Sequence, residues 1–148
     1  LGKVGGKEDD LDCNDPGYTD PDDAEKFVKE TGISSLAVAI GTAHGIYKGE
    51  PKLDVERLSE IRKRVSIPLV LHGASGVPDE AVRECIRRGI SKVNFATELR
   101  IAYTNGVRQY LNDNPEAFDP KKYGIAGMEC VTRTVKEKIT VCGSAGKA

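Results

Sequence analysis

The sequence of 148 residues has no hydrophobic run long enough to cross a membrane, and neither sign of charge prevails. A membrane-spanning helix needs about 20 predominantly apolar residues. The net charge of −1 reflects 22 basic and 23 acidic residues, which favours neither nucleic acid nor an anionic membrane surface as a partner. Hydrophobic residues make up 39% and charged residues 30%, so we expect one soluble globular domain with a buried core.

Cysteine pairs of the C-x-x-C type and a secretory signal are also lacking. A chain of this length does not need a disulfide framework, so we expect reduced thiols in a cytoplasmic protein. The chain has no initiator methionine and opens in a glycine-rich acidic stretch, residues 1–10. We therefore expect the sequence to begin inside a longer protein.

Short apolar runs alternate with amphipathic segments along the chain. The apolar run 36–40 suits a parallel strand that is buried on both faces, and 67–71 and 91–95 are expected to be the next two strands. Capping residues and apolar spacing predict helices over 20–32, 54–65, 78–89, 97–111 and 127–139. The remaining segments are expected to be irregular: a loop over 1–19, loops over 41–51 and 112–123, and a flexible tail over 140–148.

This alternation predicts an α/β fold whose parallel strands are joined by right-handed crossovers. An open doubly wound sheet and part of a (β/α)8 TIM barrel both fit the order of elements. No G-x-G-x-x-G motif follows a strand, which disfavours a dinucleotide-binding fold. Three strands cannot close a barrel that needs about 250 residues, so a barrel would require an N-terminal half outside this sequence.

Both histidines of the chain lie in polar, glycine-rich turns that follow predicted strands. His44 lies in Gly-Thr-Ala-His-Gly, and His72 opens His-Gly-Ala-Ser-Gly. Neutral imidazole is the commonest metal ligand, and carboxyl ends of parallel strands build active sites. Each histidine alone could be an inert strand-end residue, but two at one edge favour a metal site. Zinc takes at least three protein ligands, so a third ligand must come from elsewhere.

The glycine-rich turns beside the histidines predict a phosphate site. Residues 73–76 offer free backbone N–H groups and a hydroxyl just before a helix, and residues 94–97 do the same before the next helix. Each motif could instead merely form a tight turn. A metal beside a phosphate suits a phosphorylated ketose, because a metal polarises a carbonyl and stabilises an enediolate.

Residues 36–45, 69–76 and 92–98 together resemble the last three strand ends of class II fructose-bisphosphate and tagatose-bisphosphate aldolases. Residues 1–10 resemble the mobile acidic loop of that family, and 47–51 and 142–147 also fit. The resemblance covers residues 1–148 and implies the C-terminal portion of a single TIM-barrel domain. For the intact protein it implies a glycolytic lyase that cleaves fructose 1,6-bisphosphate reversibly to dihydroxyacetone phosphate and glyceraldehyde 3-phosphate.

The resemblance also implies a role for each matching residue. His44 and His72 match two of the three histidines that bind zinc, and a monovalent cation is a further candidate cofactor. Glu8 matches the mobile-loop acid that helps to move the proton on the dihydroxyacetone carbon, although a loop carboxylate can equally be a solvated charge. The residues that match the binding site for dihydroxyacetone phosphate are Gly45, Gly73, Ala74, Ser75, Asn94, Phe95, Ala96 and Thr97.

Two functional residues of the family have no counterpart here. The third zinc histidine and the acid/base aspartate lie in the earlier half, and no histidine precedes His44. We therefore expect this chain alone to be inactive, and the intact protein to form a homodimer or tetramer. Three alternatives stay open: tagatose 1,6-bisphosphate as substrate, a Schiff base on Lys92, and a non-catalytic half-barrel that binds phosphate and assembles with a partner.

Overall fold

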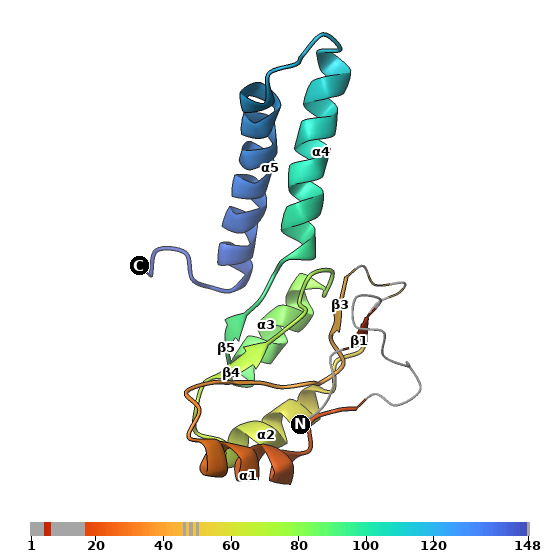
Figure 1. Cartoon of the computed structure of the whole chain (residues 1–148). Helices are drawn as coiled ribbons and strands as arrows, with labels where there is room; N and C mark the ends of the chain where they lie inside the picture. Colours follow the sequence, from red (N-terminus) through yellow and green to blue (C-terminus); the bar gives the residue numbers. More distant parts are fainter. Residues whose placement is uncertain (1–4, 7–16, 46, 48, 50, 148) are drawn as a thin grey trace. The chain divides into compact units, whose positions relative to one another are not determined.

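The computed structural model describes residues 5–6, 17–45, 47, 49 and 51–147 (Figure 1). The contacts divide the chain into two units, Leu1–Phe95 and Ala96–Ala148. The elements described in the first unit are β1 (Gly5–Gly6), α1 (Pro21–Thr31), β2 (Leu36–Ala37), β3 (Ala43–His44), α2 (Val55–Arg64), β4 (Leu69–Leu71), α3 (Asp79–Arg87) and β5 (Ile90–Val93). Those of the second unit are α4 (Thr97–Asp113) and α5 (Pro120–Val141).

The strands of the first unit are all paired in parallel. β2, β4 and β5 form one sheet with β4 in the centre, where Leu69 faces Leu36 on one side and Ile90 on the other. All three residues of β4 are buried, as expected for a central parallel strand. β1 and β3 form a separate pair in which Gly6 lies opposite His44. The predicted α/β order with parallel strands is therefore confirmed.

The core of the first unit lies between these strands and the helices α1, α2 and α3. Helices α2 and α3 bury residues of the apolar face that their spacing predicts, whereas α1 buries Ala24 and leaves Phe27 exposed. Burial of one aliphatic side chain stabilises the fold by about 1.5–3 kcal/mol. The helical residues with no exposed surface are Ala24, Leu58, Ile61, Val82 and Cys85. From the strands and the segments that follow them, Ile40, Leu69, Leu71 and Ala74 are equally buried.

Helix α1 begins and ends where the sequence predicts. An Asp20 carboxylate oxygen accepts hydrogen bonds from the N–H groups of Asp22 and Asp23, at 2.8 and 3.2 Å. Pro21 occupies the first helical position, where a missing N–H costs nothing. Gly32 ends the helix with a φ of 63°, a conformation that glycine adopts without strain.

The second unit consists of α4 and α5, which lie side by side as a helical hairpin (Figure 1). The two helices approach closely because glycines stand at the contact. A Cβ atom on Gly106 would lie 2.6 Å from the Ala126 carbonyl oxygen, and one on Gly127 would lie 2.6 Å from Cε2 of Tyr103. Both glycines are buried.

Several sequence predictions were wrong in detail. Helix α5 begins at Pro120 instead of residue 127, because the Asp119 carboxylate accepts from the Lys121 N–H at 3.0 Å and caps the helix. It extends to Val141, so the expected tail starts later, and α4 continues to Asp113 inside the expected loop. The short strands β1 and β3 lie in segments expected to be loops, since neither has the apolar run that signals a strand.

Candidate functional site

The turns after β3 and β4 bring the two histidines into contact. His44 is the last residue of β3, and His72 directly follows β4. Their Nε2 atoms are 3.3 Å apart, and the rings meet edge to face with centroids 4.7 Å apart at an interplanar angle of 75°. The two imidazoles that were predicted to share one site are therefore in contact in the structure.

The spacing of the two Nε2 atoms suits a shared metal ion. Two nitrogens bound to tetrahedral zinc at about 2.0–2.1 Å stand about 3.3–3.4 Å from each other, which matches the 3.3 Å observed. Without a metal, the same distance allows an N–H···N hydrogen bond between the rings, with the donor set by the tautomers. Within the described part of the chain no cluster of three histidine, cysteine or acidic residues could hold a metal, so the pair supplies only part of a ligand set.

Asn94 supports His72 from the neighbouring strand end. Its side-chain Nδ2 lies 3.2 Å from Nδ1 of His72. Its backbone N–H donates to the Leu71 carbonyl at 3.0 Å, and its carbonyl accepts from the Ala74 N–H at 3.1 Å. Because an amide side chain can present either a donor or an acceptor, Asn94 can hold the ring in either neutral tautomer. Metal-binding histidines usually have such a partner on the second ring nitrogen.

Tyr47 connects the two turns that carry the histidines. Its hydroxyl accepts a hydrogen bond from the Ala43 N–H at 2.7 Å and donates one to the Gly73 carbonyl at 2.9 Å. Burial raises the pKa of the Tyr47 phenol, and the Ala43 hydrogen bond only partly offsets this effect. The phenol therefore stays protonated and able to donate at neutral pH.

Gly73 permits a close approach between the same two turns. Its φ is 71°, and a Cβ atom there would lie 2.9 Å from the Ala43 carbonyl oxygen. Real Cβ atoms do not approach a backbone oxygen so closely, so any other residue would force the turns apart. Gly45 also has a positive φ, of 91°, but a Cβ atom there would meet no atom of the described residues within 4 Å.

The turn expected to bind phosphate is buried and partly committed to internal hydrogen bonds. Ala74 is fully buried, and Ser75 is 7% exposed. The Ala74 N–H donates to the Asn94 carbonyl, so the expectation that this donor is free was wrong: the turn closes against the neighbouring strand end. Phe95 is half-buried in the first unit, whereas Ala96 caps α4 and Thr97 is its first residue.

Glu8 lies outside the described residues. The Thr42 hydroxyl is buried at the turn before His44, and within the described part of the chain it has no hydrogen-bond partner. Sequence inspection assigned no role to Thr42 or Tyr47, although both lie within three residues of His44 and could have been noticed for that reason.

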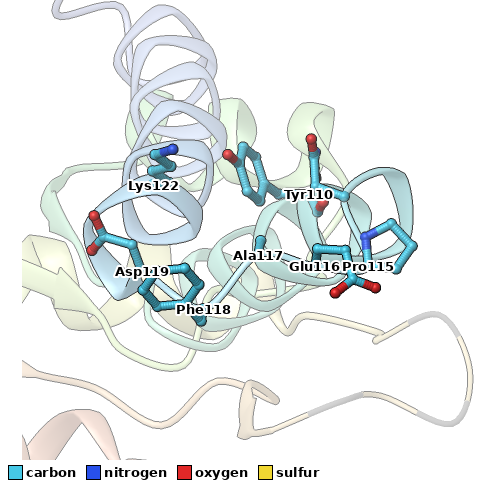
Figure 2. Close-up of a pocket in the computed structure, with 8 residues that line it drawn as sticks. Tyr110, Pro115, Glu116, Ala117, Phe118, Asp119 and Lys122 are labelled. Carbon is cyan, nitrogen blue, oxygen red and sulfur yellow. Dashed lines mark hydrogen bonds between the residues drawn. The ribbon is translucent and has the colours of Figure 1, made fainter.

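A surface pocket of about 370 Å³ lies in the second unit, at the turn between α4 and α5 (Figure 2). Two of its polar side chains take part in helix capping and turn formation. Asn114 donates from Nδ2 to the Tyr110 carbonyl at 3.0 Å, and Asp119 accepts from the Lys121 N–H at 3.0 Å. None of the predicted site residues lines this pocket. It is a feature of the hairpin turn and is not the candidate active site.

Comparison with known proteins finds one matching family and several similar solved structures. The family described as fructose-bisphosphate aldolase class-II matches residues 1–147. The chain is 44% identical to the YdjI aldolase of Escherichia coli K12, with a TM-score of 0.79 over 88% of this chain and 48% of that one. It is 30% identical to a candidate fructose-1,6-biphosphate aldolase of Coccidioides immitis, with a TM-score of 0.81 over 99% and 51% of the two chains.

A fructose-bisphosphate aldolase of Campylobacter jejuni shares the fold at 24% identity, with a TM-score of 0.73 over 86% of this chain and 45% of that one. The chain thus spans about half the length of the structures that it matches. The prediction of an α/β fold that forms part of a TIM barrel is confirmed.

Proposed function

Because the chain belongs to the class II fructose-bisphosphate aldolase family, we propose that it forms part of a zinc-dependent ketose-bisphosphate aldolase. The proposed reaction is reversible cleavage of fructose 1,6-bisphosphate to dihydroxyacetone phosphate and glyceraldehyde 3-phosphate. Tagatose 1,6-bisphosphate is the alternative substrate. The observation that carries the proposal is the 3.3 Å separation of the Nε2 atoms of His44, at the end of β3, and His72, directly after β4.

His44 and His72 would hold the metal through Nε2, with Asn94 orienting the His72 ring from Nδ1. The sequence contains only these two histidines, so a third histidine ligand has to come from outside these 148 residues. When bound, zinc would polarise the ketone carbonyl of the substrate. A monovalent cation is a further candidate cofactor.

The substrate would lie along the turns next to the histidines. We assign its phosphate and dihydroxyacetone part to two stretches, the glycine turns after β3 and β4 and the segment that leads into α4. Backbone N–H groups near helix starts are typical donors to a phosphate, although the Ala74 N–H already donates to the Asn94 carbonyl. The assigned residues are Gly45, Gly73, Ala74, Ser75, Asn94, Phe95, Ala96 and Thr97.

Proton transfer would need two groups. The hydroxyl proton on C4 leaves to an acid/base outside this sequence, and the C3–C4 bond then breaks to release glyceraldehyde 3-phosphate. Glu8 would help to return a proton to the dihydroxyacetone carbon. On this account the 148-residue chain alone does not complete the reaction, because it lacks the third metal ligand and the first acid/base.

We also propose that the intact protein is a cytoplasmic homo-oligomer. Among the described residues, every large hydrophobic side chain with high exposure except Phe27 lies within residues 101–139. Such a concentration of apolar surface is typical of an interaction face. In the described part of the chain, no helix has the length and apolar character to span a bilayer.

The test is cleavage of fructose 1,6-bisphosphate by the complete protein, before and after treatment with a chelator and again after zinc is restored. The proposal predicts activity that the chelator abolishes and zinc rescues, and no turnover from a verified 148-residue species. Tagatose 1,6-bisphosphate assayed in parallel decides the substrate. Activity that survives chelation and is trapped by borohydride with substrate would instead support a Schiff base on a lysine such as Lys92.

A further inference from the structure

The Tyr47 hydroxyl lies between the backbones that carry the two histidines. Its hydrogen-bond donor is the N–H of Ala43, the residue directly before His44. Its acceptor is the carbonyl of Gly73, the residue directly after His72. One phenol oxygen therefore links, at 2.7 and 2.9 Å, the backbones of the two residues next to His44 and His72.

The surroundings of Tyr47 are shaped to hold its ring in this place. A Cβ atom on Gly76 would lie 3.0 Å from Cδ2 of the Tyr47 ring, so the glycine leaves space for the aromatic face. Gly73, one residue from His72, lies against the Ala43 carbonyl so closely that a Cβ atom would be 2.9 Å from it. The two turns thus lie in contact at Gly73, and the Tyr47 hydroxyl hydrogen-bonds to both of them.

The link requires a group that accepts and donates at the same time. A phenol does both, whereas a phenylalanine ring of the same shape does neither. Without the hydroxyl, the Ala43 N–H and the Gly73 carbonyl each lose a partner in a half-buried region, which costs more than the loss of an exposed hydrogen bond. The two unpaired groups would regain partners by moving toward water. That movement would separate the two turns and, with them, His44 and His72.

We propose that Tyr47 is a positioning residue that sets the separation of the two histidine ligands by tying the β3 turn to the β4 turn. The inference rests on the proposed metal-dependent function. Tyr47 does not bind the metal in this account. It acts through the backbones of Ala43 and Gly73. Its loss should therefore lower the affinity for the metal and change the geometry of the two histidine ligands.

The test is Tyr47→Phe in the complete protein, with zinc affinity measured by competition with a chromophoric chelator. Mutation of residues that hold metal ligands in place typically lowers metal affinity by about 10–100-fold, and we expect a loss of zinc affinity in that range. The visible absorption spectrum of the cobalt-substituted protein should also change, because the ligand geometry relaxes. Tyr18→Phe is the matched control: that ring is also half-buried and lies over Arg57, and its zinc affinity should match the wild type.

Gly76→Ala gives a second variant that keeps the hydroxyl. Its Cβ atom would lie 3.0 Å from Cδ2 of Tyr47, so the ring must shift slightly, and the φ of 86° adds backbone strain. The variant should reproduce the Tyr47→Phe effect on the cobalt spectrum. Wild-type affinity and an unchanged spectrum in Tyr47→Phe would overturn the positioning role and leave the proposed function intact. A wild-type protein that binds neither zinc nor cobalt would overturn both the positioning role and the metal-dependent function.

Discussion

The two units of the chain use glycine for close contact, but with different consequences. In the first unit, Gly73 brings two strand-end turns together beside the histidines. In the second, Gly106 lets α4 and α5 approach at Ala126 and Cys130. The same steric device therefore places a pair of candidate metal ligands in one unit and joins two helices in the other.

The two units also differ in how many side chains they bury. The first unit has a continuous core of strand and helix residues with no exposed surface. The second buries only Gly106, Gly127 and Val141 among its helical residues and exposes side chains such as Met128 and Phe118, which is 92% exposed. A rigid core suits ligands that must keep a fixed geometry, whereas an exposed apolar hairpin suits association with another surface.

The largest expected effect comes from removing a histidine. His44→Ala or His72→Ala in the complete protein should lower activity by more than about 100-fold, because a first ligand matters more than the outer partners that cost about 10–100-fold. Zinc content and fructose 1,6-bisphosphate cleavage measure this loss. Lys92→Ala, on the exposed side of β5, is the control and should keep both. Full activity in either histidine variant would remove the assigned role.

Gly73→Ala should give the next largest effect, with Gly32→Ala as its matched control. Both glycines have a left-handed φ, 71° and 63°, which costs any other residue about 1–2 kcal/mol. Only Gly73 also has a backbone oxygen within 2.9 Å of the added Cβ, so overpacking should add about 1–3 kcal/mol. Urea unfolding measures both costs, and equal destabilisation by the two variants would contradict the close contact of the turns.

A third pair of variants tests the hairpin of the second unit. Gly106→Ala should destabilise the fold by about 1–3 kcal/mol, because its Cβ would lie 2.6 Å from the Ala126 carbonyl oxygen. Gly124→Ala meets only the Tyr103 hydroxyl at 3.7 Å, so helix propensity should stabilise it by up to about 1 kcal/mol. Circular dichroism during urea unfolding separates the two. The same sign of change in both variants would mean that the helices do not pack closely at Gly106.

Thiol labelling gives the smallest effect. Burial raises the pKa of Cys85 to about 11, and the thiolate is the reactive form. Cys85 is therefore protonated at pH 8 as well as shielded, whereas Cys130 is partly exposed. Peptide mapping after mild alkylation of the native protein should find Cys130 modified and Cys85 unmodified. Rapid modification of Cys85 at pH 8 would show that the first unit opens readily.

Sequence patterns were sufficient wherever local chemistry decides the structure. Asp20 and Gly32 fixed the ends of α1, and the apolar run at 69–71 predicted a buried parallel strand. The start of α5 was missed because Gly124 and Gly127 weaken its helical signal, although Asp119 and Pro120 repeat the start signal of α1. Glycines that serve a helix contact cannot be distinguished from loop glycines without the partner helix.

The candidate site shows the same limit. The position of His44 and His72 after neighbouring strands was enough to predict that they meet. The Tyr47 link and the Ala74 hydrogen bond to Asn94 depend on how separate turns fold against each other, which no sequence spacing encodes. Sequence therefore predicted that the two histidines meet, and only the fold revealed the contacts around them.

The most direct test is a crystal structure of the complete protein with zinc, located by its anomalous scattering. The account predicts one zinc ion within about 2.0–2.1 Å of Nε2 of both His44 and His72, with a further ligand from residues outside this sequence. Zinc bound elsewhere, or to only one of the two histidines, would contradict the central claim that these strand ends form a shared metal site.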